Sequence, residues 1–418
     1  MTGERVEALY LIETGTDVDR AVDVMAGEQS SGTFVPLPGE TPELKARSGA
    51  RVEAIEVFAE VAEPSLPGAR RTTGLPIRQA RVRLSWPVEN FGPSLPNLFT
   101  TVAGNLFELQ QFSGLKVLDV TFSPAFFRRY AGPAFGIAGT RALALVPEGP
   151  MIGTIIKPSV GFSPEQVADL VTTLAEAGLH FIKDDELQSD GPICPFEERV
   201  ARVTEAVDRV AQRTGRRVMY AFNLTGEIDE MLHRHDVVAR AGGTCVMVVM
   251  NSVGLAGMTA LRRHATLPIH GHRAGWGSLS RHPALGWSYI AWSKFWRLAG
   301  VDHLHVNGLR NKFCEPDDSV IAAARSLLTP LDPACPAIVM PVFSSGQTVA
   351  QVPETLQALG TSDLMYLAGG GIVGHPGGPA QGVESLRQAW DAAARGVSLD
   401  LHAKSHPALA TALRALVR

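Results

Sequence analysis

The chain contains 418 residues, of which 45% are hydrophobic and 19% are charged, and its formal net charge is -4. This length is sufficient for two domains with a large hydrophobic core. Because the charge is slightly negative, the composition argues against a nucleic-acid-binding protein and against a surface that binds anionic membranes.

Neither the cysteines nor the N-terminal residues indicate export. The four cysteines, at positions 194, 245, 314 and 335, lie far apart and lack the spacing of a zinc site, which favours reduced thiols in a cytoplasm. The N-terminal apolar run has acidic neighbours and no small-residue cleavage site. No stretch approaches the roughly 18 apolar residues of a membrane span. We expect a cytoplasmic protein that is neither secreted nor membrane-spanning.

Residues 1–140 are expected to form a smaller α+β domain with an antiparallel sheet. Residues 52–61 and 78–86 alternate between apolar and polar side chains, which is typical of strands with one buried face. Proline-rich connectors separate such stretches, as expected of a small mixed domain.

Residues 141–418 show a different pattern, in which short apolar stretches alternate eight times with helical segments. In one helical segment, Ser163 is a suitable N-cap, Pro164 occupies the first helical position and Gln166 completes a capping box. Another segment, residues 196–207, is apolar at helical spacing. The expected strands are residues 152–157, 179–183, 218–223, 245–250, 267–272, 303–306, 337–342 and 364–368.

Eight strand–helix units in about 250 residues have the number and size of a TIM barrel. A doubly wound sheet would also alternate strands and helices, but no GxGxxG motif follows the first strand. The sequence therefore predicts an α/β protein. Its catalytic domain is a C-terminal (β/α)8 barrel that ends in a helical tail, and the smaller α+β domain precedes it.

Polar side chains gather at the C-terminal ends of the predicted barrel strands, where TIM barrels carry their active sites. Seven of the eight strands end in this way, and seven polar ends at one mouth indicate a site rather than an accident of loops. They are Lys157, residues 183–186 (KDDE), Asn223, residues 270–273 (HGHR), His305, residues 344–346 (SSG) and residues 369–371 (GGG).

The KDDE segment brings one amine and three carboxylates to the end of a mostly apolar run. Carboxylate oxygens are ligands that suit Mg²⁺. Because side chains alternate along a strand, Asp184 is expected to point away from the mouth and to be structural. The segment therefore predicts a magnesium site.

The same segments carry a family resemblance. Five motifs, in this order and at these spacings, resemble the large subunit of ribulose-bisphosphate carboxylase (RuBisCO) and RuBisCO-like proteins. They are IIKPSVGFSP (155–164), FIKDDE (181–186), IHGHRAGWG (269–277), DHLHVNGLRNK (302–312) and AGGGIVGHPGGP (368–379). The likeness extends into the N-terminal domain at residues 28–33 (EQSSGT) and 102–107 (VAGNLF), so it covers nearly the whole chain.

For the metal site, the resemblance implies that Lys183 reacts with CO₂ to form a carbamate. Asp185 and Glu186 are then the other ligands of one Mg²⁺ per site. The physical argument agrees, because a divalent cation offsets the repulsion among three oxyanions.

For catalysis, the resemblance implies that Lys157 carries the proton in enolisation and that His272 is an active-site histidine. Lys312, seven residues after His305, occupies the position of the lysine in the family's mobile sixth loop. His270 is either a satisfied core histidine or a functional one, and the sequence leaves both readings open.

For the substrate, the resemblance implies a phosphorylated small molecule. The residues at the family's substrate- or phosphate-binding positions are Thr33, Arg273, His305, Ser344, Gly346, Gly369, Gly370 and Gly371. Glu28 and Asn105, with Thr33, match residues that reach the barrel mouth of a partner subunit. The resemblance thus implies a homodimer, or a dimer of dimers, without a small subunit.

Departures from the family pattern argue against a bisphosphate carboxylase. Ser159 stands where carboxylases have a second lysine, Ile155 replaces a threonine, and Trp276 replaces a histidine. The sixth loop reads NGLRNK instead of the carboxylase GTVVGK. Loss of an amine near a developing enediolate removes an electrostatic contact of about 3 kcal/mol.

The resemblance therefore implies a RuBisCO-like enzyme that forms a metal-stabilised enediolate from a phosphorylated oxo sugar acid. The HGHRAGWG segment and the sixth loop favour decarboxylation, or carboxyl transfer with hydrolysis, of a substrate similar to 3-oxo-isoapionate 4-phosphate in acid-sugar catabolism. One alternative is an enolase or isomerase of methylthio-ribulose or diketo-methylthiopentyl phosphate. Another is a non-catalytic regulatory relative, which the retention of all three metal ligands disfavours.

Overall fold

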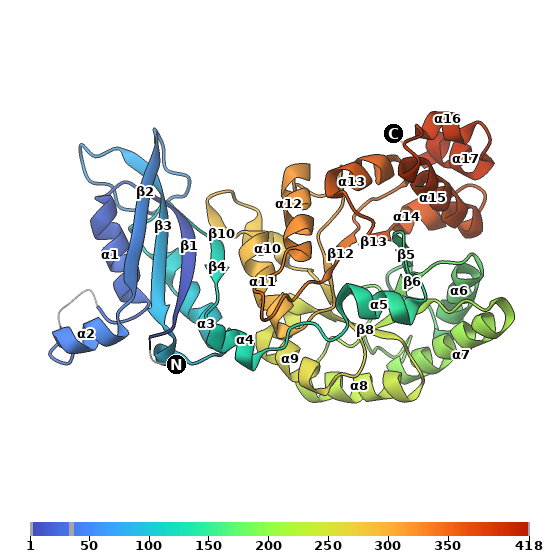
Figure 1. The fold of residues 1–418 in the computed structure, drawn as a ribbon, viewed down its shortest axis with the longest axis horizontal. Helices are drawn as coiled ribbons and strands as arrows, with labels where there is room; N and C mark the ends of the chain where they lie inside the picture. The colour runs from blue at the N-terminus through green and yellow to red at the C-terminus, as the bar shows by residue number, and fades with distance from the viewer. Residues whose placement is uncertain (1–2, 33–36, 417–418) are drawn as a thin grey trace. The chain divides into compact units, whose positions relative to one another are not determined.

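The computed structural model describes residues 3–32 and 37–416, so the predicted substrate-binding Thr33 lies outside the described residues. The chain forms two compact units, one of Met1–Ala131 with Gly275–Ala299 and one of Gly132–Ala274 with Gly300–Arg418 (Figure 1). A domain boundary between residues 140 and 141 stays a prediction. Among the helices of the described ranges, none is both long and apolar enough to cross a membrane.

The first unit is built on a five-stranded sheet with the strand order β10-β4-β1-β3-β2. Its strands are β1 (Arg5–Thr14), β2 (Arg51–Val61), β3 (Ile77–Pro87), β4 (Gly114–Thr121) and β10 (Leu285–Trp287). The predicted strands at residues 52–61 and 78–86 are confirmed as β2 and β3. The expected antiparallel pairing holds for the first four strands, but β10 pairs with β4 in parallel.

The parallel strand comes from a part of the chain remote from the rest of this sheet. Residues 275–299, between two barrel strands in sequence, belong to the first unit. There the buried Trp276 contacts the rings of Tyr289 and Trp292, with centroids 5.7 and 4.8 Å away. The unit's helices are α1 (Val18–Glu28), α2 (Pro42–Ser48), η1 (Val88–Asn90), α3 (Leu95–Val102), η2 (Leu106–Glu108), α4 (Pro124–Arg129), α10 (Trp276–Ser280) and α11 (Tyr289–Ala299).

The second unit contains a closed barrel of eight parallel strands in the order β11-β12-β13-β5-β6-β7-β8-β9. The strands are β5 (Met151–Ile155), β6 (Phe181–Lys183), β7 (Met219–Asn223), β8 (Cys245–Val249), β9 (Ile269–His272), β11 (His303–His305), β12 (Met340–Phe343) and β13 (Met365–Leu367). The predicted TIM barrel is confirmed, and each predicted strand overlaps an observed one. The predicted strand 152–157 was too long, because β5 ends at Ile155 and Lys157 lies in the loop that follows.

Helices follow the barrel strands as the sequence predicts. The capping box of α6 is present, since the Ser163 hydroxyl accepts the Gln166 N–H and the Gln166 side chain accepts the Ser163 N–H. The unit's helices are α5 (Gly136–Ala144), α6 (Pro164–Glu176), α7 (Phe196–Thr214), α8 (Ile228–Arg240), α9 (Met250–His264), α12 (Asp317–Leu328), η3 (Val349–Gln351), α13 (Val352–Leu359), α14 (Gly369–Val373), α15 (Pro379–Ala394), α16 (Leu399–Ala403) and α17 (Pro407–Leu416).

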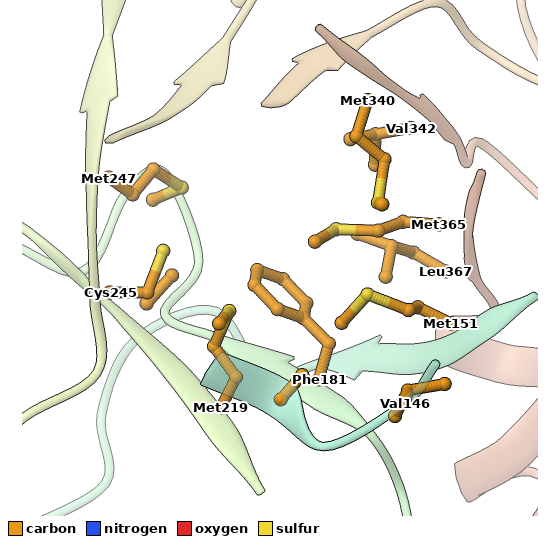
Figure 2. Close-up of a cluster of buried hydrophobic side chains, with 12 residues drawn as sticks. Val146, Met151, Phe181, Met219, Cys245, Met247, Met340, Val342, Met365 and Leu367 are labelled. Atoms are coloured by element: carbon orange, nitrogen blue, oxygen red, sulfur yellow. The ribbon is translucent and has the colours of Figure 1, made fainter. Parts of the chain in front are cut away.

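The interior of the barrel is apolar along most of its strands and polar along β9 and β11. Figure 2 shows apolar side chains that converge from β5, β6, β7, β8, β12 and β13, among them Met151, Phe181 and Met365. On β9 and β11, buried histidines take the corresponding place, and the Phe181 ring lies 5.0 Å from the ring of His270 and 6.0 Å from that of His303. A polar network therefore begins inside the barrel, next to an apolar layer.

Candidate active site

The end of β6 brings the predicted metal ligands together. Lys183 and Asp185 are each 1% exposed. The Lys183 Nζ donates to the Asp184 carbonyl oxygen at 2.9 Å and lies 3.4 Å from Glu186 Oε2. Asp185 Oδ2 lies 2.6 Å from the Nζ of Lys157. Asp185 is thus paired with Lys157, and Glu186 is paired with Lys183.

Asp184 belongs to a different network, as strand alternation predicts. Its carboxylate accepts hydrogen bonds from Arg199 Nε at 3.3 Å, from the Tyr220 hydroxyl at 2.5 Å and from the Asn223 N–H at 2.9 Å. Asp184 and Arg199 are fully buried, and a buried carboxylate needs such partners. The predicted structural role of Asp184 is confirmed.

The serine in place of the family's second lysine contacts the first lysine. Lys157 Nζ donates to Ser159 Oγ at 2.8 Å while it pairs with Asp185. Ile155, in place of the family's threonine, packs against the apolar barrel layer. Compared with the carboxylases, Ser159 removes a positive charge from the mouth and Ile155 removes a hydroxyl group. Ser159 also provides a hydrogen-bond acceptor for Lys157.

Burial and charge act in opposite directions on the groups around Glu186. Burial lowers the pKa of the Lys183 amine, although Glu186 and Asp185 raise it in part. Burial raises the pKa of Glu186, but the charge of Lys183, together with hydrogen bonds from the backbone and from Lys183, more than offsets this, so the net shift is downward. Burial also lowers the pKa of His272 well below its usual value. The neutral His272 ring lies beside the predicted metal ligands, with its Nε2 3.4 Å from Glu186 Oε2.

A chain of buried hydrogen bonds runs through the histidines of β9 and β11. The Thr140 hydroxyl lies 2.5 Å from the Gly136 carbonyl oxygen, and two oxygens at this distance need the hydroxyl proton between them. The Thr140 oxygen must therefore accept from His303 Nε2, which is 2.7 Å away. Burial lowers the pKa of His303 to about 3, so the ring is neutral and its Nδ1 is an acceptor. That nitrogen lies 3.4 Å from His270 Nδ1, which must be the donor.

The same reasoning extends to the barrel mouth. Burial lowers the pKa of both His270 and His305 well below the usual range, so both rings are neutral. With its proton on Nδ1, His270 accepts from His305 Nε2 at 2.7 Å. His305 Nδ1 then accepts from the Ser344 hydroxyl at 3.1 Å. Both ring nitrogens of His305 are therefore engaged, and its ring also lies 4.6 Å from the ring of His272.

Arg273 follows β9 and is held by a residue that the sequence reasoning missed. Its Nη2 lies 2.5 Å from Glu315 Oε2, and the same oxygen accepts from Asn307 Nδ2 at 2.7 Å. Arg273 and Glu315 are distant in sequence, so no local pattern links them. The only signal was an acidic side chain three residues after Lys312 in the sixth loop.

The other predicted residues of the mouth lie in loops. Lys312 is exposed, and its Nζ lies 5.3 Å from the centre of the Phe313 ring. The Lys312 N–H donates to the Ser345 carbonyl oxygen at 3.2 Å, which joins the sixth loop to the loop after β12. Gly346 in that loop has φ +88°, a conformation that favours glycine.

The triple glycine forms the first turn of α14, directly after β13. A Cβ on Gly371 would lie 2.6 Å from the Gln347 carbonyl oxygen, so a larger residue does not fit there. A Cβ on Gly370 would meet nothing within 4 Å.

The two described residues that were predicted to reach a partner subunit lie in the first unit. Glu28 is the last residue of α1, and Asn105 directly precedes η2. Their role in a partner's site stays a prediction, as do the individual roles of the barrel residues.

Comparison with known families covers both units. The chain matches the family "Ribulose bisphosphate carboxylase large chain, catalytic domain" over residues 136–331 and 334–416. It matches the corresponding N-terminal domain over residues 4–126. Together these ranges include the site residues of the barrel as well as Glu28 and Asn105.

Individual relatives match along the whole length. A 3-oxo-isoapionate-4-phosphate transcarboxylase/hydrolase of Xanthobacter autotrophicus is 59% identical, over 98% of this chain and 99% of its own. A 3-oxo-isoapionate-4-phosphate decarboxylase of Rhizobium etli is 44% identical, over 97% of each chain. The crystal structure of a rubisco-like protein from Burkholderia fungorum has a TM-score of 0.92 and 46% identity, and the match covers 98% of this chain and 99% of that one. The two curated relatives are thus enzymes that act on the same phosphorylated sugar acid.

Proposed function

The chain belongs to the ribulose bisphosphate carboxylase large-chain family, among its RuBisCO-like members, and from this premise we propose that it acts on 3-oxo-isoapionate 4-phosphate. The observation that carries the proposal is the presence of two ion pairs at the end of β6, Lys157–Asp185 and Lys183–Glu186, with a serine where carboxylases have their second lysine. The identity of 59% with a transcarboxylase/hydrolase favours carboxyl transfer with hydrolysis as the outcome. Decarboxylation is the alternative outcome, since the 44% identical relative is a decarboxylase.

The donor set suits Mg²⁺. Asp185 and Glu186 supply two carboxylates, and a carbamate on Lys183 would add a third oxyanion. The approach of the Lys183 amine to 3.4 Å from Glu186 supports a shared cation. When bound, Mg²⁺ would polarise the oxo group of the substrate. We propose one such ion per site.

The phosphate is proposed to bind at Arg273, Ser344, Gly346 and the glycines 369–371. A guanidinium forms strong charge-assisted hydrogen bonds to phosphate, and open backbone N–H groups at a glycine turn can add to them. His305 supports this site by holding the Ser344 hydroxyl at 3.1 Å. Lys312 is proposed to reach the substrate from the sixth loop.

Lys157 is proposed to carry the proton. Its side chain is 47% exposed, so its amine can exchange protons with solvent between turnovers. In hydrolysis, water adds to the oxo carbon and loses a proton to the solvent, and an adjacent carbon-carbon bond breaks. The electron pair stays on the departing carbon, which takes a proton from Lys157. In decarboxylation, the bond to the carboxyl carbon breaks, CO₂ leaves, and Lys157 protonates the remaining carbon.

Family membership also supports a homodimer, or a dimer of dimers, in which Glu28, Thr33 and Asn105 of one chain complete the site of its partner. We propose that no small subunit is needed. A cytoplasmic location remains part of this proposal.

A substrate panel tests the function. The purified protein, with Mg²⁺ and bicarbonate, is incubated separately with 3-oxo-isoapionate 4-phosphate, methylthio-ribulose phosphate, diketo-methylthiopentyl phosphate and ribulose bisphosphate. Mass spectrometry of the products and CO₂ release are followed. We expect turnover of the oxo-isoapionate phosphate and no fixation of CO₂ into ribulose bisphosphate. Turnover of only a methylthio-sugar phosphate would show that the chain is an enolase or isomerase instead.

A further inference from the structure

The guanidinium proposed to bind phosphate already has an anionic partner in the chain. Arg273 and Glu315 are 2.5 Å apart, and their side chains are only 10% and 13% exposed. Glu315 is fixed at both carboxylate oxygens, since Oε2 also accepts from Asn307 Nδ2 and Oε1 accepts from Ser319 Oγ at 2.9 Å. The carboxylate is therefore a built part of the mouth and not a mobile surface charge.

The backbone around Glu315 supports the same arrangement. Asn307 and Ser345 both have positive φ angles, 72° and 71°, which residues other than glycine rarely adopt. The Ser345 hydroxyl donates to Asn307 Oδ1 at 2.8 Å, which leaves Asn307 Nδ2 directed to Glu315. Unfavourable backbone conformations persist where the surrounding contacts hold them, and they cluster at functional sites.

A phosphate dianion and this carboxylate compete for one guanidinium. In a site with little water, two anions beside the same cation repel each other more strongly than they would in bulk solvent. A phosphate must either displace Glu315 from Arg273 or share the guanidinium with it. Both outcomes reduce the affinity for the phosphate group alone.

We propose that Glu315 is a specificity-determining residue that competes with phosphate for Arg273. It lowers the affinity of the mouth for free phosphate, so a substrate must contact the rest of the site to bind well. This inference depends on the proposed function, because it takes Arg273 as a phosphate ligand.

The test is the binding of inorganic phosphate to the full-length protein, measured by isothermal titration calorimetry. In Glu315→Gln, the guanidinium loses its competing charge while the side chain keeps its size, and we expect the Kd for phosphate to fall about tenfold. The matched control is Glu354→Gln. It removes the same charge from an exposed pair with Arg310 of the sixth loop, 3.4 Å away, and should change the Kd less than twofold.

A merely structural role for Glu315 predicts the opposite sign, because Arg273 would lose its support and bind phosphate less well. An unchanged or raised Kd in Glu315→Gln therefore overturns the inference. Should this variant fail to fold, Glu315→Asp, which withdraws the carboxylate by one methylene, is expected to give a smaller decrease in Kd, and no decrease would again overturn it.

Arg273→Met separates this inference from the proposed function. If Arg273→Met abolishes phosphate binding while Glu315→Gln leaves it unchanged, only the role of Glu315 is wrong. If Glu315→Gln/Arg273→Met still binds phosphate as tightly as Glu315→Gln, Arg273 is not a phosphate ligand, and the proposed site is wrong as well.

Discussion

At the scale of single residues, two neighbouring aspartates show how strand geometry assigns roles. Asp184 is held by Arg199 and Tyr220, whereas Asp185 faces Lys157 in the barrel mouth. The two residues are chemically identical, so the alternation of the chain decides which one faces the barrel mouth. The sequence permitted this prediction because it needs only the position of a strand end.

The proposed carbamate on Lys183 gives the first prediction. Lys183→Ala removes the third oxyanion, so we expect the affinity for Mg²⁺ to fall at least about tenfold and its dependence on CO₂ to vanish. Titration calorimetry with and without bicarbonate measures both quantities. Lys183→Glu should restore part of the affinity without CO₂, because it supplies an oxygen directly. Unchanged Mg²⁺ affinity in Lys183→Ala, with or without CO₂, would exclude the carbamate.

The proposed proton carrier gives the second prediction. Lys157→Met should lower kcat by a factor on the order of 10² to 10⁴ and leave KM within a few-fold, because general acid catalysis acts on the transition state. Arg273→Ala should instead raise KM, because its contact with phosphate is made before and during the reaction. Steady-state kinetics of both variants on the active substrate make the comparison. If both variants changed kcat and KM in the same way, the roles assigned to Lys157 and Arg273 would be wrong.

At the scale of elements, the pairing of β9 with β11 creates the histidine network. The two strands run in parallel with His303 opposite His270, which places the imidazoles of both strands in contact inside the barrel. The histidines of each strand, at positions 270 and 272 and at positions 303 and 305, are two residues apart in the sequence. It was therefore predictable that the two histidines of one strand lie on the same face of that strand. The order of donors and acceptors was not predictable, because it begins at Thr140 on α5, far from either strand in sequence.

This hydrogen-bond order gives the third prediction, which concerns the neutral ring forms. We expect the proton on Nε2 in His303 and His305 and on Nδ1 in His270, as the bonds from Thr140 to Ser344 require. Long-range ¹H–¹⁵N correlation spectra of the labelled protein at pH 7.5 distinguish the two forms. His270→Phe serves to assign the His270 signals. A signal from His305 protonated on Nδ1 would contradict the deduced order.

The strands of the barrel were predictable because their apolar runs and polar ends are local features of the sequence. The origin of β10 was not, because a strand of three residues has no distinctive pattern and its partner β4 lies far away in sequence. The Arg273–Glu315 pair was missed for the same reason. Contacts between remote segments are set by the three-dimensional path of the chain, and a single sequence does not display that path.

At the scale of the whole barrel, buried neutral histidines make stability depend on pH. Burial lowers the pKa of His180 to about 4 and that of His303 to about 3, and it lowers those of His270 and His305 well below 6.5. In the unfolded chain these groups take up protons near pH 6.5. Their contribution to stability is therefore complete above that pH and is lost as the pH falls toward the folded pKa values.

The fourth prediction follows with its sign. The free energy of unfolding should decrease below about pH 6.5, by up to about 1.4 kcal/mol per pH unit for each histidine that stays neutral in the fold. Urea unfolding at pH 7.5, 6.5, 5.5 and 5.0 measures it. His303→Gln should make the decline shallower. Equal stability across this range would show that the buried rings are protonated in the folded protein.

The central claim is that this barrel mouth breaks a carbon-carbon bond of a phosphorylated oxo acid, and the fate of the substrate carboxyl group tests it most directly. 3-Oxo-isoapionate 4-phosphate labelled with ¹³C in the carboxyl group is incubated with the protein and Mg²⁺, and the label is followed by ¹³C NMR. The account predicts rapid loss of the substrate signal, with the label retained in a smaller carboxylic acid if carboxyl transfer and hydrolysis occur, or released as CO₂ if decarboxylation occurs. Substrate that persists unchanged, with Mg²⁺ and CO₂ at saturation, would contradict the account.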